Sequence, residues 1–273
     1  MSEHMLYTKL ARYYDVIYKD YLRSAVPMLV SAYEECFRRF SRRRVRDVLD
    51  IACGTGGPTI ELARRGYLVV GVDLHREVIE LAKEKARKLG LDVEFRVCDA
   101  RELDKMFDSN SFDAVTMFFT SIAYMTELDD LVKLLKSVRH VLRKGGVFVA
   151  DSANPHEFMF RLGSRGGENS SVTWDTEGLE RGEHLVVTEW NEIVNWVNCT
   201  NKFKALITIV REGGVTESYL VSDTLRLYTA TEFTLVAKLA GFSESRAMCY
   251  FRGQVLEPGA GGRCSRLLFI AIA

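Results

Sequence analysis

The stretch Val48-Leu-Asp-Ile-Ala-Cys-Gly-Thr-Gly-Gly57 begins with apolar residues, includes an acid and ends with three glycines in four positions. The apolar run predicts a buried strand, and the glycines predict a tight turn from that strand into a helix. Glycine also lets a ligand approach the backbone closely, because it has no side chain. A strand-to-helix turn often needs a glycine for structural reasons alone. Taken by itself, this turn is therefore explained equally well by a structural role and by binding of a nucleotide-like ligand.

The composition is that of a globular protein. Of the 273 residues, 47% are hydrophobic, and 37 acidic residues balance 37 basic ones to a formal net charge of zero. This length is enough for one large domain, or for one domain with an insertion. A neutral chain has no general attraction to nucleic acid or to an acidic membrane. We interpret the arginine-rich run 38–46 as a solvated helix end rather than as an RNA contact.

The cysteines do not have the spacing of a metal site. They are Cys36, Cys53, Cys98, Cys199, Cys249 and Cys264. We expect buried free thiols and no metal, in a reduced, cytoplasmic protein. The chain has no apolar signal core and no apolar run of membrane-spanning length, so we expect no membrane association.

Strand and helix patterns alternate up to about residue 160. Helical patterns cover 5–40. Strands are expected at 45–51, 67–73, 93–100, 112–119 and 147–152, and the helices between them start after Gly57 or span 76–90 and 128–146. This alternation has the spacing of βαβ units and predicts a parallel sheet with helices on both faces.

The pattern changes after residue 160. The stretch 161–171 is predicted to be a flexible link, and 171–228 reads as antiparallel strands, with a hairpin turn at Glu212-Gly-Gly214. A capped helix at 229–242 and two terminal strands follow. The predicted organisation is an N-terminal part, 1–160, a β insertion, 161–228, and a return to the α/β core, 229–273.

Acids end three successive strands. Asp73 lies 23 residues beyond Asp50, close to the spacing of a ribose-binding acid, and Asp99 ends the third strand. Asp99 could accept a hydrogen bond from an adenine amino group, with the adenine held between Leu74 and Ala100. Because the carboxyl ends of parallel strands meet at one edge of the sheet, three such acids are not easily explained as helix caps alone.

The spacing of the glycines distinguishes between two classes of adenosine-containing ligand. A dinucleotide fold needs G-x-G-x-x-G, whereas residues 52–58 read A-x-G-x-G and position 59 is threonine. Asp50 would repel a pyrophosphate but would attract a cation. A cationic amino acid–adenosine conjugate therefore fits this turn, and a dinucleotide does not.

The stretch Asp50-Ile-Ala-Cys-Gly-Thr-Gly56, with Asp73, Asp99 and the long alternation, resembles the class I S-adenosylmethionine-dependent methyltransferases over essentially the whole chain. Ala52 departs from the glycine usual in that family. The resemblance implies a Rossmann-like, seven-stranded, mostly parallel α/β sheet with an antiparallel β insertion after the fifth strand. It also implies S-adenosyl-L-methionine as the cofactor.

The resemblance assigns parts of the cofactor to residues. Asp50 and the glycine turn would hold the methionine part, Asp73 the ribose and Asp99 the adenine, with the stretch 117–121 on the other side. The cofactor contacts predicted in this way are Tyr14, Asp50, Ala52, Cys53, Gly54, Gly56, Asp73, Leu74, Asp99, Ala100, Met117 and Phe118.

The stretch Ala11-Arg-Tyr-Tyr-Asp-Val-Ile-Tyr18 is similar to the aromatic lid helix of small-molecule methyltransferases, including those that act on amino sugars. This similarity is why Tyr14 is included above; amphipathic packing of the tyrosines is the alternative. The β insertion resembles substrate-covering inserts of the same subgroup. Four of its aromatic residues either line an apolar acceptor pocket or form its own core. They are Trp174, Trp190, Trp196 and Tyr219.

Methyl transfer depends mainly on orientation and on excluding water, so it does not require a conspicuous catalytic residue. An oxygen or a protonated amine needs a base, for which His156 and Tyr18 are the candidates, with Glu157 and Tyr124 also in position. We predict methyl transfer to N or O of a small molecule. Methylation of RNA or protein, a non-catalytic S-adenosylmethionine-binding protein and a nicotinamide-dependent oxidoreductase are the alternatives, and the oligomeric state stays open.

Overall fold

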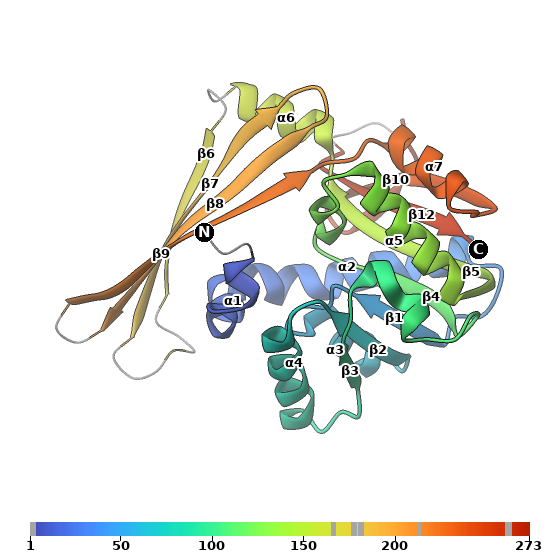
Figure 1. Ribbon diagram of the computed structural model, residues 1–273, viewed down its shortest axis with the longest axis horizontal. Coiled ribbons are helices and arrows are strands. Elements are labelled where there is room, and N and C mark those ends of the chain that lie inside the picture. Colours follow the sequence, from blue (N-terminus) through green and yellow to red (C-terminus); the bar gives the residue numbers. More distant parts are fainter. Residues whose placement is uncertain (1–3, 165–167, 176–178, 180–182, 212–213, 260–263) are drawn as a thin grey trace.

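A central sheet of eight described strands organises the molecule (Figure 1). The structure is a computed structural model that describes residues 4–164, 168–175, 179, 183–211, 214–259 and 264–273. The strand order is β11-β10-β12-β5-β4-β1-β2-β3. The strands are β1 (Asp47–Ile51), β2 (Leu68–Asp73), β3 (Glu94–Val97), β4 (Phe112–Met117), β5 (Leu142–Ala153), β10 (Glu244–Phe251), β11 (Gln254–Leu256) and β12 (Arg266–Ile272).

The first five strands are parallel, and β12 and β10 join them antiparallel. The Rossmann-like sheet with a β insertion is therefore confirmed. The short strand β11 is an addition that the pattern did not predict: it pairs only with β10, as the return of a hairpin. Every residue of β4 is buried, as expected for a central strand covered on both faces.

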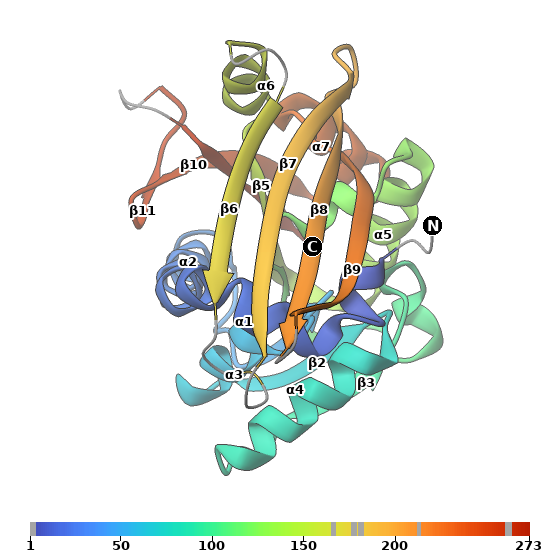
Figure 2. The same cartoon turned by 90° about the vertical axis from the view of Figure 1, so that its left-hand side faces the viewer.

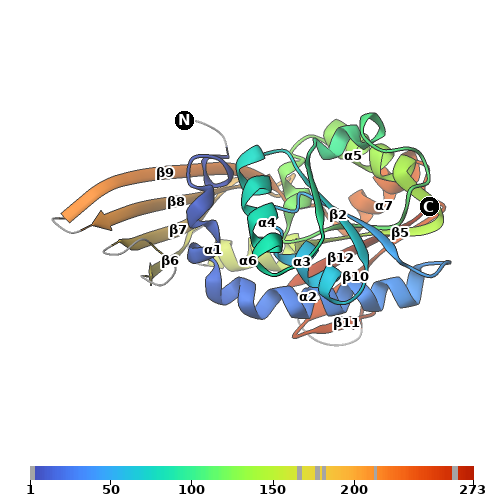
Figure 3. The ribbon, with the colours of Figure 1, turned by 90° about the horizontal axis from the view of Figure 1, so that it is seen from below.

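Helices cover both faces of this sheet (Figure 3). One face carries α2 (Lys19–Phe40), α3 (Gly57–Arg64) and α4 (Arg76–Lys88). The other carries α5 (Leu128–Val141), α7 (Ala230–Leu239) and the short 3-10 helix η3 (Ala100–Lys105). Helix α5 ends at Val141, and β5 starts at the next residue, so the helix predicted at 128–146 was five residues too long.

A second sheet stands beside the carboxyl ends of the parallel strands (Figures 1 and 2). Its order is β6-β7-β8-β9, and all neighbours are antiparallel. The strands are β6 (Glu168–Asp175), β7 (His184–Asn195), β8 (Thr200–Arg211) and β9 (Gly214–Arg226). Arg211 pairs with Gly214, which confirms the β8–β9 hairpin, although turn residues 212–213 lie outside the described part of the chain.

Two predictions for this region were wrong. The expected link 161–171 is the end of helix α6 (Pro155–Ser164) and the start of β6, with 165–167 outside the described residues. Trp196 is 59% exposed, and Trp190 lies opposite Lys204 on the outer face of the sheet, so neither tryptophan lines an inner pocket. Tyr219 packs on the inner face. The side chain of Trp174 lies outside the described parts.

Three short helices at the N-terminus fill the space between the two sheets. They are η1 (Met5–Tyr7), η2 (Ala11–Tyr13) and α1 (Tyr14–Ile17). Leu6, Leu10 and Tyr13 pack against apolar side chains of β7, β8 and β9, among them Val187 and Ile207. Burial of this apolar surface holds the second sheet to the N-terminal segment.

Cys249 and Cys264 form a disulfide with a Cα–Cα distance of 5.3 Å, which corrects the expectation of six free thiols. The register of β10 against β12 places Cys249 opposite Leu267, near the start of β12. A separation of 15 residues with no paired-cysteine motif gave no sign of this contact. Cys36, Cys53, Cys98 and Cys199 are free. Among the described helices, none is long and apolar enough to span a membrane.

We predict that the change Cys249→Ser lowers the free energy of unfolding by about 3 kcal/mol, because a bridge of this span restricts the unfolded chain. Urea titration of the wild type and the variant measures the difference. Dithiothreitol should produce the same loss in the wild type and no further loss in the variant. Equal stability of oxidised and reduced wild type would contradict the prediction.

Candidate active site

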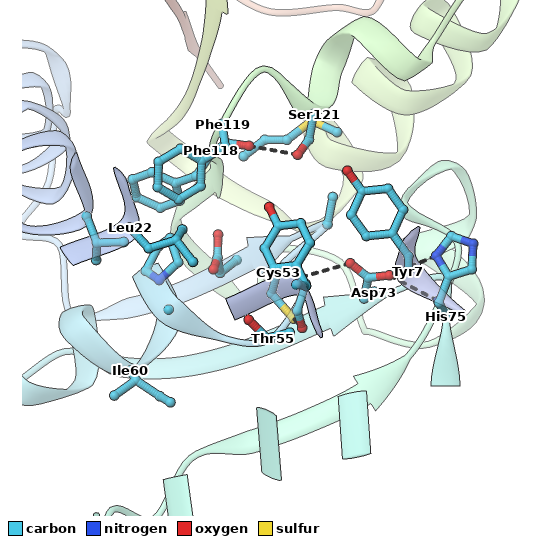
Figure 4. Close-up of a pocket in the computed structure, with 18 of the residues that line it drawn as sticks. Tyr7, Leu22, Cys53, Thr55, Ile60, Asp73, His75, Phe118, Phe119 and Ser121 are labelled. Carbon is cyan, nitrogen blue, oxygen red and sulfur yellow. Dashed lines mark hydrogen bonds and ion pairs between the residues drawn. The ribbon is translucent and has the colours of Figure 1, made fainter. Parts of the chain in front are cut away.

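A cavity of about 730 Å³ lies where the parallel strands end, between the glycine turn and the N-terminal helices. Figure 4 shows Cys53 and Thr55 of the turn on one side of it and Phe118, Phe119 and Ser121 across from them. All of the predicted cofactor contacts line this cavity except one. Those that line it are Tyr14, Asp50, Ala52, Cys53, Gly54, Asp73, Leu74, Asp99, Ala100, Met117 and Phe118.

The exception is Gly56, whose role is packing. Its φ is +78°, and a Cβ there would lie 3.0 Å from both the Cβ of Ala82 on α4 and the ring of Phe95. Gly54 differs: its φ is +54°, and a Cβ added there would meet nothing within 4 Å. Gly54 therefore presents bare backbone to the cavity, whereas Gly56 lets α4 approach the turn.

Asp73 orders the glycine turn. The Gly54 N–H donates to Asp73 Oδ2 at 2.9 Å, and the His75 N–H donates to Asp73 Oδ1 at 3.0 Å (Figure 4). A carboxylate has about four acceptor positions, so Asp73 retains capacity for a ligand hydroxyl. The turn is therefore ordered by Asp73, at the end of the neighbouring strand.

Asp50 is buried beneath the turn. Thr59 donates a hydrogen bond to its Oδ2 at 2.6 Å, and Thr116 donates to its Oδ1 at 2.8 Å. Burial raises the pKa of Asp50 to about 7, against the lowering effect of the two threonine hydrogen bonds, and the charge of Asp73 adds to the rise. A cation in the cavity would favour the ionised form of this carboxyl.

Asp99 also accepts hydrogen bonds from a neighbouring residue of the protein. The Arg101 N–H donates to its Oδ1 at 2.9 Å, and the Arg101 guanidinium donates to Oδ2 at 2.7 Å. Partial burial raises the pKa of Asp99, but the hydrogen bonds and charge of Arg101 outweigh it, so the pKa is lowered. Asp99 therefore caps η3 as an ionised group while it lines the cavity.

Aromatic side chains close the side of the cavity toward the second sheet. The hydroxyls of Tyr7 and Tyr124 lie 2.9 Å apart, Tyr7 stacks on His75, and its ring lies 5.7 Å from that of Tyr14. Burial raises the pKa of Tyr7, Tyr14 and Tyr124 well above the usual value. These phenols therefore stay protonated near neutral pH and act as donors.

Of the four candidate bases, Tyr124 lines the cavity, whereas Tyr18, His156 and Glu157 do not. Tyr18 donates a hydrogen bond to Glu189 Oε1 on β7 at 2.7 Å, and burial, with the charge of Glu189, raises its pKa well above the usual value. This environment disfavours proton acceptance by Tyr18. His156 is exposed on α6, where its backbone N–H donates to Asn154.

A polar contact ties α1 to the glycine turn. Thr55 Oγ1 donates to Asp15 Oδ1 at 2.6 Å, and Lys85 Nζ lies 2.5 Å from Asp15 Oδ2. All three residues line the cavity. This latch closes the N-terminal helices over the turn; the tyrosine pattern indicated a lid, but nothing in it indicated Lys85 on α4 as a partner.

Asp151 holds the loop that follows β4. Phe119 and Thr120 have φ values of +57° and +62°, which are unfavourable for residues other than glycine. Their N–H groups donate to Asp151 Oδ1 and Oδ2 at 2.8 and 3.1 Å, and Tyr33 and Arg266 also bond this carboxylate. Asp151 lies two residues before the end of β5 at Ala153, so a search for acids near the carboxyl ends of strands could have found it.

Comparison with known proteins identifies the family. Residues 48–146 match the family model described as a methyltransferase domain. The chain is 31% identical to the cypemycin N-terminal methyltransferase of a Streptomyces species over 196 residues, covering 72% of each chain. It therefore belongs to the S-adenosylmethionine-dependent methyltransferases of class I fold, and S-adenosyl-L-methionine is its cofactor.

Solved structures support the fold. An S-adenosylmethionine-dependent methyltransferase from Clostridium acetobutylicum superposes with a TM-score of 0.71 at 20% identity, covering 95% of this chain and 97% of the other. The sugar N-methyltransferase KedS8 from a Streptoalloteichus species gives 0.72 at 22% identity, covering 95% and 92%. At these identities the likeness concerns the architecture alone.

The residues of the cavity fit the cofactor. Gly54 leaves open space above its backbone, Asp73 and Asp99 offer carboxylate acceptors, and Asp50 lies buried below. Carboxylates suit ribose hydroxyls, an amino group and a sulfonium cation, and Gly54 allows close backbone approach. The donor and acceptor set is that of a cationic nucleoside site.

We predict that the stability of the cofactor-free protein falls by about 4 kcal/mol as the pH rises from about 4 to about 7, through Asp50 alone. The reason is that the folded carboxyl holds its proton more tightly than the unfolded one, so its contribution is complete at low pH and is lost through pH 7. Urea titrations across this range on wild type and Asp50→Asn isolate the effect. Parallel pH profiles for the two proteins would contradict it.

We predict that Asp15→Asn speeds dissociation of S-adenosylhomocysteine about two- to fivefold, because a partly exposed latch of this kind contributes under about 1 kcal/mol. Stopped-flow fluorescence measures the dissociation rate. Asp20→Asn, an exposed acid on α2, is the matched control. If both variants release the ligand at the wild-type rate, Asp15 does not hold the lid.

Proposed function

We propose that the protein transfers the methyl group of S-adenosylmethionine to a nitrogen or oxygen atom of a small molecule. One observation carries this proposal: the cavity is bounded by the glycine turn on one side and by buried aromatic residues under the second sheet on the other. A site enclosed in this way suits a compact acceptor better than an RNA or a folded protein. The similarity of the chain to the cypemycin N-terminal methyltransferase and to the sugar N-methyltransferase KedS8 supports it.

In the proposed mechanism, the residues of this chain act mainly by positioning the cofactor and the acceptor. When bound, S-adenosylmethionine supplies an electrophilic methyl group on a positively charged sulfur. Asp73 and the Gly54 backbone hold the nucleoside end, while the buried Asp50 favours positive charge in the cavity. Orientation of the two reactants can supply roughly 7–11 kcal/mol of the barrier reduction.

In this proposal, the N-terminal helices act as a lid that excludes water from the cavity. Tyr7, Tyr14 and Tyr124 separate the cavity from the second sheet, and the Asp15 latch keeps α1 on the glycine turn. The loop held by Asp151 places Phe119 and Ser121 at the far wall. The acceptor enters beside this loop, and the β insertion, 161–228, covers it as a substrate lid on the core formed by 1–160 and 229–273.

Two further features belong to this proposal. His156 and Tyr18 remain the predicted bases, although Glu189, which Tyr18 contacts, has the chemistry to accept a proton where Tyr18 does not. A cytoplasmic location also remains a prediction. Disulfides such as Cys249–Cys264 are common in the cytosol only in hyperthermophiles, so a cytoplasmic location would fit a hyperthermophilic source better than a mesophilic one.

We predict that S-adenosylhomocysteine at 100 times its dissociation constant stabilises the protein by about 2.7 kcal/mol, and that NAD does not. Thermal unfolding with each ligand measures this. Asp73→Asn should weaken S-adenosylhomocysteine at least tenfold, since hydrogen bonds to charged groups are worth about 1.5–3 kcal/mol.

The matched control is Asp92→Asn, an exposed acid between α4 and β3, which should bind as the wild type does. Stabilisation by NAD but not by S-adenosylhomocysteine would refute the proposed function. Unchanged affinity in Asp73→Asn would refute the role of that carboxylate alone.

A further inference from the structure

The inner face of the second sheet has two chemically different halves. Strand alternation and register place Val187, Ile207 and Val221 in one half, buried against the N-terminal helices. Polar side chains continue the same face in the other half. They are Glu189 and Asn191 on β7, Asn201 on β8 and Asp223 on β9, with Phe203 directly opposite both Asn191 and Asp223.

This polar half adjoins the cavity. Strand β9 packs against the 3-10 helix η4 (Ser121–Tyr124), which follows the loop held by Asp151 (Figure 2 shows the sheet face-on). The backbone N–H of His4, a cavity-lining residue, donates to Asp223 Oδ1 at 3.2 Å. The charge of Asp223 also contributes, after burial, to the raised pKa of Tyr124. The polar half therefore adjoins the cavity through His4 and Tyr124.

Two acceptor atoms in this half have no partner. Asp223 Oδ2 and Asn201 Oδ1 are buried and accept no hydrogen bond from any described residue. The Asp223 side chain is only 2% exposed. Leaving a buried carboxylate oxygen without a donor is costly, and folded proteins rarely do so without a functional reason. On the same face, Glu189 lies two strands away, in the row of Ala205 and Val221, and adds a half-buried carboxyl that accepts a hydrogen bond from Tyr18.

We propose that Asp223, Asn201 and Glu189 form the recognition site for the methyl acceptor, and that this acceptor is a compact primary or secondary amine. An ammonium group supplies the donors that Asp223 Oδ2 and Asn201 Oδ1 lack, and its positive charge adds an attraction to the carboxylate that a neutral hydroxyl does not have. Phe203 provides an apolar contact for the skeleton of the amine. This inference rests on the proposed function and narrows its acceptor to one class.

The cationic side chain nearest along β9 does not satisfy Asp223. Arg226 lies three residues further on, so its side chain starts on the opposite face of the strand. It donates to Glu232 Oε1 at 2.9 Å and lies over the ring of Tyr228. Lys9 lies over the ring of Tyr219, beside the apolar half. The imidazole Nδ1 of His4 lies 3.4 Å from Asp223 Oδ1, so Oδ2 is the oxygen of this carboxyl that is left for a cation.

The test measures binding rather than turnover. Isothermal titration of the protein saturated with S-adenosylhomocysteine uses three amines, each beside its hydroxyl counterpart: D-glucosamine and D-glucose, L-alaninamide and L-lactamide, 2-phenylethylamine and 2-phenylethanol. We expect at least one amine to bind more than tenfold tighter than its counterpart. Asp223→Asn should remove that preference, with the affinity for S-adenosylhomocysteine unchanged.

Two further variants keep the test decisive if Asp223→Asn folds poorly. Glu189→Gln keeps the acceptor for Tyr18 but removes a charge, and should weaken the same amine. Thr224→Ala, on the exposed outer face of β9, is the matched control and should change nothing.

The possible results distinguish a failure of the amine site from a failure of the proposed function. Binding of S-adenosylhomocysteine without binding of any amine, equal binding of amine and hydroxyl partners, or full amine affinity in both Asp223→Asn and Glu189→Gln would overturn the amine site and leave the proposed function standing. Failure to bind S-adenosylhomocysteine would overturn the proposed function, and this inference with it.

Discussion

The carboxylate of Asp151 makes the hydrogen bonds on which one wall of the cavity depends. It receives hydrogen bonds from Tyr33 on α2, from the backbone of Phe119 and Thr120, and from Arg266 on β12. One buried charge therefore fixes a helix, an antiparallel strand and a loop with two consecutive left-handed residues. Such a charge is tolerated only when it is fully paired. The wall of the cavity formed by the β4 loop follows from that pairing.

Four strands of the core have an aspartate at or within two residues of their carboxyl end, and the four carboxyls have different roles. Asp50 is buried with a raised pKa, Asp73 orders the glycine turn, Asp99 is held by Arg101, and Asp151 fixes the β4 loop. Their place at the edge of a parallel sheet follows from the strand pattern. Their roles follow from depth and neighbours, because burial and hydrogen bonds set both the charge and the acceptor positions left for a ligand.

The N-terminal helices join the two halves of the active site. On one side the Asp15 latch fastens them to the glycine turn, and on the other their apolar residues pack on the second sheet. The second sheet is thereby tied to the cofactor-binding side of the molecule. If the N-terminal helices act as the proposed lid, their movement would affect both the cavity and the contact of the second sheet with it.

Local patterns along the chain predict the parallel core, the glycine turn and the acids near strand ends. These depend on local periodicity and on glycine's freedom of dihedral angles, which adjacent residues encode directly. The same patterns predict the hairpin of β8 and β9. The ends of α5 and β5 were not determined, since the change from helix to strand at Leu142 has no glycine or proline to mark it.

Which of these residues share a site depends on how the helices and strands pack together. Gly56 proved to serve packing because Phe95 and Ala82 come from elements that sequence spacing does not relate to it. The Cys249–Cys264 bridge and the contact of His4 with Asp223 join segments whose proximity depends on strand register. The environment of Asp223 arises in the same way. A pattern along the chain fixes the direction of a side chain, but its partners are set by how the elements pack.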